Sequence, residues 1–226
     1  MSFELIEAVK NNNAEILSDL LKNENVDINL KDSYNNTALI LAVKNNNAEI
    51  VSILTKSPNI DLNISNGFDT ALTLAIKNNN AEIVSILSKC DNIDLNIKDS
   101  SGITPFYLAY NNDNKEIMNI LIKSGADINL NNDDGTVALT CSAFYGNFEV
   151  VKLLIENKAN INIQNANKST AILLASYKGY IDIVRFLIEK GADLNIKNEK
   201  DSTALSIAKK RNYTDIINIL EDSGAL

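Results

Sequence analysis

The chain has 226 residues, 45% of them hydrophobic, so it is long enough to bury a sizeable core. Its net charge of −8 argues against a nucleic-acid backbone or an anionic membrane as the main partner, because both bind basic surfaces. The lack of histidine excludes histidine-activated nucleophiles and histidine metal sites, and two cysteines, Cys90 and Cys141, are too few for a structural zinc site or a disulfide framework.

A short phrase of the form Thr-(Ala/Pro)-(Leu/Phe/Ile)-x-x-Ala recurs along the chain. It begins at Thr37, Thr70, Thr104, Thr170 and Thr203, with intervals of 33, 34, 66 and 33 residues. The doubled interval holds a degenerate copy at Val137–Ser142. A period near 33 residues predicts a stacked array of small helical units, which has a binding surface rather than a central active-site pocket.

The first helix of each copy is predicted from its two ends. Thr37 precedes the apolar stretch 38–43, and its hydroxyl can accept from the free amides of a helix start, so it is a predicted N-cap. The helix is predicted to end where a residue tolerates left-handed backbone. These positions are Asn46, Asn79, Asp113, Gly146, Gly179 and Asn212.

A second helix is predicted over residues 48–54, where apolar residues at i, i+1, i+3 and i+4 form one stripe to be buried. Neither helix is long enough to be stable alone, so stacking on neighbouring copies must stabilise both. An Asp-x-Asn phrase follows, as at Asp61–Asn63, and a polar turn after it predicts a tight hairpin. The third copy lacks one residue around Ser65 to Phe68, so its hairpin tip is predicted to differ.

The phrase Gly102–Ala109, with Gly125–Asn129 behind it, resembles an ankyrin repeat. The resemblance covers essentially the whole chain and implies an all-α fold with short β-hairpins, a solenoid of about seven stacked helix-turn-helix units. We expect one domain over residues 1–226. Its repeats are expected at residues 1–32, 33–65, 66–98, 99–131, 132–164, 165–197 and 198–226.

Some positions depart from the family pattern. Only Pro105 keeps the proline after threonine, and Lys158 stands where Gly125 and Gly191 stand in other copies, which predicts a left-handed lysine. Asp19 and Lys209 occupy otherwise apolar columns in the first and last copies, so we expect polar outer faces and a complete array. The many asparagines are typical of a nucleotide bias in the source genome and receive no functional weight.

The sequence offers little for chemistry. The oxygen-rich stretch 131–135 is a poor calcium loop, because Leu130 and Cys141 stand where the first ligand and the bidentate glutamate are needed. Glu49 and its equivalents recur near a helix start, which favours an interaction with the helix dipole over catalysis. We therefore predict no catalytic residue, no cofactor and no metal. An enzyme with an unrecognised carboxylate site is the alternative.

The resemblance also implies a binding surface, the concave groove formed by the hairpin tips and the exposed side of the first helices. Exposed aromatic residues are typical of binding hot spots, although Phe144 alternatively packs between adjacent copies. The predicted partner-binding residues are Tyr34, Lys77, Ile103, Asn111, Asn112, Asp133, Asp134, Phe144, Tyr145, Tyr177, Lys178, Lys210 and Arg211.

The predicted function is a monomeric, non-catalytic protein-interaction module, acting as an adaptor or as an inhibitor. Lys178 and Arg211 would suit a partner that mixes apolar anchors with acidic groups. The start of the chain lacks the pattern of a secretory signal, and no apolar run is long enough to span a bilayer, so a cytoplasmic location is expected. A secreted bacterial effector that binds a host protein is the alternative.

Overall fold

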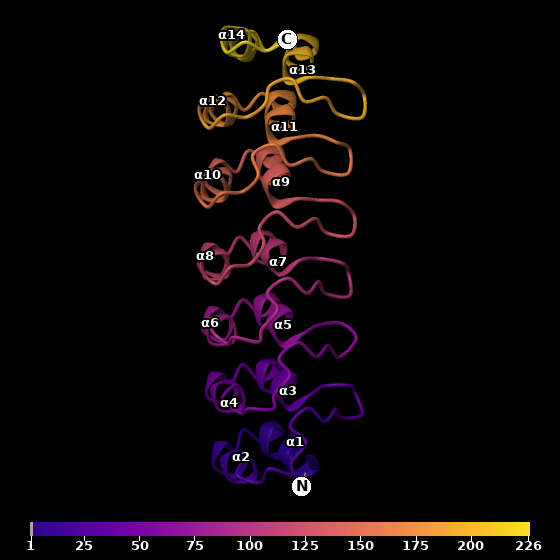
Figure 1. Ribbon diagram of the computed structural model, residues 1–226, viewed down its shortest axis with the longest axis vertical. Helices are drawn as coiled ribbons and strands as arrows, with labels where there is room; N and C mark the ends of the chain where they lie inside the picture. Colours follow the sequence, from indigo (N-terminus) through magenta and orange to yellow (C-terminus); the bar gives the residue numbers. More distant parts are fainter. Residues whose placement is uncertain (1) are drawn as a thin grey trace. The chain divides into compact units, whose positions relative to one another are not determined.

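A computed structural model describes residues 2–226, which divide into two compact units, residues 2–127 and Ile128–Leu226 (Figure 1). The described residues form fourteen helices, so the predicted all-α class is confirmed. The first unit holds α1 (Ser2–Lys10), α2 (Ala14–Leu20), α3 (Ala38–Lys44), α4 (Ala48–Leu54), α5 (Ala71–Lys77), α6 (Ala81–Leu87), α7 (Pro105–Asn111) and α8 (Lys115–Lys123). The second holds α9 (Ala138–Tyr145), α10 (Phe148–Glu156), α11 (Ala171–Lys178), α12 (Ile181–Glu189), α13 (Ala204–Arg211) and α14 (Thr214–Asp222).

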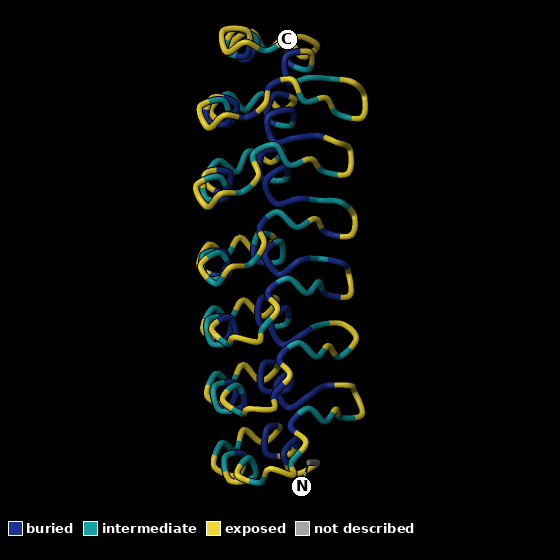
Figure 2. Tube along the Cα trace, in the orientation of Figure 1, coloured by how far each residue is buried: buried dark blue, intermediate teal, exposed yellow. Residues whose placement is uncertain are grey.

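Within each unit, each odd-numbered helix pairs with the even-numbered helix that follows it and packs against its counterpart in the adjacent copy. In the first unit α3 contacts α1, α4 and α5, and in the second unit α11 contacts α9, α12 and α13. Residues Ala38–Val43 of α3 are all buried, since this short helix has neighbours on most sides (Figure 2). Stacking therefore supplies the stability that helices of this length lack alone. That the whole chain forms a single domain stays a prediction.

The predicted helix starts are largely confirmed. Thr37 accepts a hydrogen bond at Oγ1 from the amide of Ile40 (3.3 Å), and Thr70, Thr104 and Thr203 cap their helices in the same way. Thr170 also stands at the N-cap of α11, but its buried Oγ1 has no hydrogen-bond partner. The degenerate copy begins at Val137, which has no side-chain oxygen to cap α9.

The predicted helix ends are confirmed at all six positions. Asn46, Asn79 and Asp113 have positive φ angles of 52°, 58° and 50°, as do Asn212 and the two glycines Gly146 and Gly179. Lys158 is left-handed as predicted, with a φ angle of 67°. The residue types alone therefore located these turns, because few side chains tolerate this backbone region.

The loops between copies are held by side chains rather than by strands. Among the described residues, a single isolated antiparallel β-bridge joins Lys31 and Thr37. At other tips an Asp or Asn side chain accepts from the turn amides, as Asp99 Oδ1 does from Ser101 and Ile103. The turn of the third copy is tighter. Its Asn66 amide donates to the carbonyl three residues later, that of Asp69, whereas in the fourth copy the Asp99 amide donates to the carbonyl four residues later, that of Ile103. The prediction of an altered third tip is confirmed.

A ladder of asparagines links consecutive copies within each unit. Asn63 Oδ1 accepts from the Asp94 amide (2.8 Å), and its Nδ2 donates to the Asn92 carbonyl (2.9 Å). Asn29, Asn96, Asn129, Asn162 and Asn195 likewise accept an amide of the next copy. The asparagine of the Asp-x-Asn phrase therefore has a structural role, which composition alone did not reveal.

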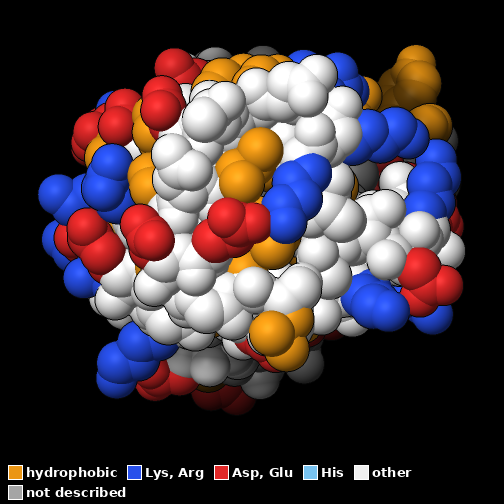
Figure 3. Space-filling model, turned by 90° about the horizontal axis from the view of Figure 1, so that it is seen from above, with side chains coloured by type: hydrophobic (Ala, Val, Ile, Leu, Met, Phe, Trp, Pro, Cys, Tyr) orange, Lys and Arg blue, Asp and Glu red, His pale blue; other side chains and the backbone are white. Residues whose placement is uncertain are grey.

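The charged residues at the ends of the two apolar columns lie at exposed positions. Asp19 is exposed and pairs with Lys22 (2.7 Å), and Lys209 is exposed and pairs with Glu221 (2.7 Å). Figure 3 looks onto α13 and α14 and shows a largely polar face with hydrophobic side chains in small groups. The exposed Asp19 and Lys209 agree with the predicted polar caps, although the first copy also exposes the apolar side chains of Phe3 and Ile16, at 73% and 50%.

Replacing Lys158 by glycine is expected to stabilise the protein by up to about 1 kcal/mol or to leave its stability unchanged. A side chain at a φ angle of 67° is strained, and glycine relieves that strain, although it also makes the unfolded chain more flexible. Urea denaturation measures the change in midpoint. A clear fall in the midpoint would show that Lys158 has a stabilising contact that outweighs the strain.

Candidate functional site

In the first unit, the predicted residue Lys77 binds within its own chain. Its Nζ lies 2.8 Å from a carboxylate oxygen of Asp69 and 2.8 Å from one of Asp99, whose side chain is only 2% exposed. Burial lowers the pKa of Lys77, but the hydrogen bonds to both carboxylates outweigh it, so the pKa is raised above its ordinary value. Lys77 therefore ties the loops of two copies together.

Asn112 is likewise engaged between copies. Its Nδ2 donates to the Ile76 carbonyl at the end of α5 (2.8 Å), and Asn45 and Asn78 donate in the same way to Val9 and Val43. Each of these carbonyl groups also accepts a backbone amide of the turn that ends its helix, so the asparagine side chain adds a second hydrogen bond to it. The recurrence of asparagine at one position of successive copies is the sequence signal that indicates this structural role.

The other predicted residues of the first unit have different environments. Tyr34 is 79% exposed at a loop tip, and Asn111 is exposed at the end of α7. Ile103 is half-buried, and its amide and carbonyl close the loop on Asp99. Lys77 and Asn112 are exposed as well but are bound within the chain, so Tyr34 and Asn111 are the exposed candidates of the first unit outside these contacts.

In the second unit, aromatic rings and cations from successive copies lie against each other. Lys178 Nζ lies 4.4 Å from the centre of the Phe144 ring, and the Arg211 guanidinium carbon lies 3.9 Å from the centre of the Tyr177 ring. Phe144 also packs edge-on against Tyr145 (5.2 Å between ring centres). The structure therefore brings the predicted residues of α9, α11 and α13 together in two aromatic–cation pairs.

A hollow of about 470 Å³ lies beside the second of these pairs. Tyr177 and Arg211 line it from α11 and α13, and Lys210 lies beside them. The other lining residues are Ile207 of α13 and Asn198, Lys200 and Ser202 of the preceding loop. Four of the lining residues are absent from the predicted set: Asn198, Lys200, Ser202 and Ile207. Ile207 lies one helical turn before Arg211, a spacing that indicates a shared face.

Tyr145 and Tyr177 are the exposed aromatic residues of this unit, with 69% and 41% of their surfaces accessible. Phe144 is half-buried, so it is partly covered by its neighbours. Asp133 and Asp134 are exposed at the loop before α9. Asp134 Oδ1 accepts from the Thr136 hydroxyl and amide, and these hydrogen bonds hold the pKa of Asp134 below its ordinary value.

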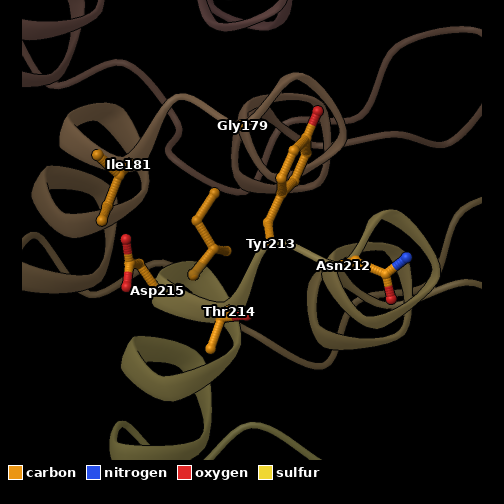
Figure 4. Close-up of a pocket in the computed structure, with 7 residues that line it drawn as sticks. Gly179, Ile181, Asn212, Tyr213, Thr214 and Asp215 are labelled. Atoms are coloured by element: carbon orange, nitrogen blue, oxygen red, sulfur yellow. The ribbon is translucent and has the colours of Figure 1, made fainter.

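Two tyrosines of the second unit pack against glycines of the preceding copy, Tyr180 against Gly146 and Tyr213 against Gly179. Figure 4 shows the Tyr213 ring extending toward Gly179, in a hollow of about 350 Å³. A Cβ atom at Gly179 would lie 3.0 Å from this ring, and one at Gly146 would lie 2.8 Å from the Tyr180 ring. The first unit has asparagine pairs at the equivalent positions, as in the hydrogen bond from Asn114 to Asn79 (2.7 Å).

Replacing Gly146 by alanine is expected to destabilise the protein by about 2 kcal/mol, because the new methyl group overlaps the Tyr180 ring. Gly191→Ala is the matched control. Its φ angle of 84° is close to the 76° of Gly146, but a Cβ atom there meets nothing within 4 Å. The control should cost only the backbone strain, about 1 kcal/mol. Equal losses in urea denaturation would show that the Tyr180 contact does not limit the packing.

The described residues hold no group of three or more Asp, Glu, Cys or His side chains able to bind a metal ion. None of the helices in this part of the chain is both long and apolar enough to traverse a lipid bilayer.

Comparisons with known proteins agree with this architecture. A family model of ankyrin repeats, in three copies, matches residues 5–99, 92–165 and 143–225. Among solved structures, the chain is similar to the ankyrin repeat domain of Bcl-3, described as a unique member of the IkappaB protein family. The TM-score is 0.82 and the identity 26%, over 95% of this chain and 97% of that chain. No curated protein sequence matches the chain.

Proposed function

Since the chain belongs to the ankyrin repeat family, whose domains are generally protein-interaction modules, we propose that it is a non-catalytic module that binds a partner protein. The partner surface is formed in the second unit by Tyr145, Tyr177 and the cations beside them. The half-buried Phe144 packs against Tyr145 and carries Lys178 over its ring.

The observation that carries the proposal is the exposure of Tyr145 and Tyr177 next to positively charged side chains. Exposed tyrosines are costly in water and contribute a large, rigid contact area when a partner covers them. Arg211 lies over the Tyr177 ring and fixes its position before any partner arrives. Ordered anchors of this kind reduce the entropy lost on binding.

The contrast with the first unit supports this choice of surface. There the equivalent positions are occupied by Lys77 and Asn112, whose polar groups already bind Asp69, Asp99 and the Ile76 carbonyl. A partner would have to break these contacts before using the same groups. The second unit offers its groups without that cost.

The proposal includes a monomeric protein in the cytoplasm, where the free thiols of Cys90 and Cys141 would stay reduced. Two roles fit such a surface: an adaptor joins its partner to another protein, and an inhibitor covers the partner's own site. A secreted bacterial effector would use the same surface on a host protein, and the origin of the partner distinguishes this case.

Affinity capture from the native lysate, followed by mass spectrometry, tests the proposal. We expect one protein to be retained in a stoichiometric amount and to be displaced by an excess of the free chain. The contrary result is that the purified protein turns over a small molecule and that this activity is lost in a series of Glu→Gln variants. That result would assign the chain to the enzymes.

A further inference from the structure

The geometry points to an acidic peptide segment as the partner element that enters the hollow beside Tyr177. We propose that carboxylates of this segment bind Arg211, Lys210 and Lys200, while a neighbouring apolar side chain covers Tyr177 and Ile207. This inference rests on the proposed function and specifies the chemistry of the partner.

The hollow is positively charged although the chain as a whole is acidic. Three of its seven lining residues are Lys200, Lys210 and Arg211, and no described lining residue is Asp or Glu, in a chain with a net charge of −8. Figure 3 shows several basic side chains on the side of the loops, with an acidic side chain among them, whereas the side of α14 carries both acidic and basic side chains. A local basic site on an acidic protein favours a short acidic segment over a long polyanion, which would also meet the acidic surface.

The cations of this surface are free to bind carboxylates. Among the described residues, Lys200, Lys210 and Arg211 form no ion pair, whereas Lys77 and Lys209 are each neutralised by a carboxylate of the chain. The guanidinium carbon of Arg211 lies over the Tyr177 ring, 3.9 Å from its centre. The edge of a stacked guanidinium keeps its N–H donors available, and these donors match the two oxygens of a carboxylate.

The size and lining of the hollow fit a few side chains of an extended segment. Its volume of about 470 Å³ lies in the usual range for pockets that hold small groups. Tyr177 and Ile207 provide apolar surface, while Asn198 and Ser202 provide hydrogen-bonding groups. The hollow would therefore recognise an apolar residue together with the acidic residues next to it.

The test is a selection of short random peptides, displayed on phage, against the immobilised full-length protein, followed by calorimetry with the enriched peptides. We expect these peptides to be rich in Asp and Glu and to carry an apolar residue. Their affinity should fall about tenfold in a Lys210→Gln, Arg211→Gln double variant and should weaken as salt is added.

The matched control is the Arg185→Gln, Lys190→Gln double variant, which removes the same charge from an exposed position of α12 and from its exposed C-cap, both outside the hollow. It should change the affinity by less than about twofold. Equal losses in the two double variants would overturn the inference, because a general charge effect would then explain the binding.

Other outcomes separate this inference from the proposed function. Neutral or basic peptides that lose affinity in the Tyr145→Ala, Tyr177→Ala variant would overturn the inference and leave the proposed surface intact. Peptides that bind every variant equally would overturn both. Binding of duplex DNA or phosphatidylserine vesicles with loss in the Lys210→Gln, Arg211→Gln variant, without any enriched peptide, would also overturn both.

Discussion

Replacing Tyr145 and Tyr177 together by alanine is expected to weaken binding of the captured partner by about 4 kcal/mol, roughly a thousandfold in Kd. Each ring is an exposed hydrophobic anchor, and hot-spot residues of this kind contribute about 2 kcal/mol or more. The helical content should not change, because both side chains lie outside the core. Isothermal titration calorimetry and circular dichroism measure the two quantities.

Phe68→Ala is the matched control for this experiment. Phe68 has the same exposed fraction as Tyr145, 69%, but lies in a loop of the first unit. Its loss should change the affinity by less than about 0.5 kcal/mol. A large loss for Phe68→Ala together with unchanged affinity for the tyrosine variant would place the binding surface in the first unit.

Lys77→Met is expected to lower the free energy of unfolding by about 3 kcal/mol. The substitution leaves the Asp99 carboxylate, with a side chain only 2% exposed, without the cation that compensates its charge. This loss is at the low end of the range for breaking a buried ion pair, about 3–5 kcal/mol. Lys77 is itself 36% exposed, so water screens part of its interaction with Asp99. Urea denaturation measures the loss.

Lys152→Met is the comparison for Lys77→Met. Lys152 pairs with Glu156 at 3.8 Å, and both side chains are about half exposed (49% and 52%). Loss of such a pair should cost less than about 0.5 kcal/mol. If the two variants lose the same stability, Lys77 is not a structural link between loops.

The stabilisation by Lys77 is expected to depend on pH at both extremes. Burial raises the pKa of Asp99, but hydrogen bonds from Lys77, Ile103 and Ser101 outweigh it and hold the pKa below its ordinary value. This contribution is present above the unfolded-state pKa, about 4, and is lost as pH falls through the lower folded-state value. The raised pKa of Lys77 gives a contribution that is present below about pH 10 and lost as pH rises through the folded-state value.

Urea denaturation of the wild type and Lys77→Met across pH checks this dependence. The difference in unfolding free energy should be largest near neutral pH and should shrink in strong acid and strong base. A difference that stays constant down to about pH 2 would contradict a stabilising interaction with ionised Asp99.

Local sequence signals predicted the helices and turns of this chain well. The left-handed residues Asn46, Asp113 and Gly146 were identified by type, because only a few side chains tolerate that backbone conformation. The threonine N-caps were also predicted from local sequence, because the threonine hydroxyl and the amide that it caps are only three residues apart. Lys158 was predicted from its alignment with Gly125 and Gly191.

Interactions between copies were not predictable in this way. Whether Asn112 faces a partner or the Ile76 carbonyl depends on how one copy is placed against the one before it. The same holds for Arg211 over Tyr177, two residues that lie on different helices, α13 and α11. Sequence alone therefore named the groove positions, whereas the structure distinguishes those already engaged within the chain from those left exposed.

Hydrogen exchange of the full chain, with and without the captured partner, tests the central claim most directly. We expect the partner to slow amide exchange in residues 198–212, which contain the loop and α13 beside the hollow, and to leave residues 2–127 unchanged. Slower exchange confined to residues 2–127 would contradict the assignment of the binding surface to Tyr145, Tyr177 and Arg211.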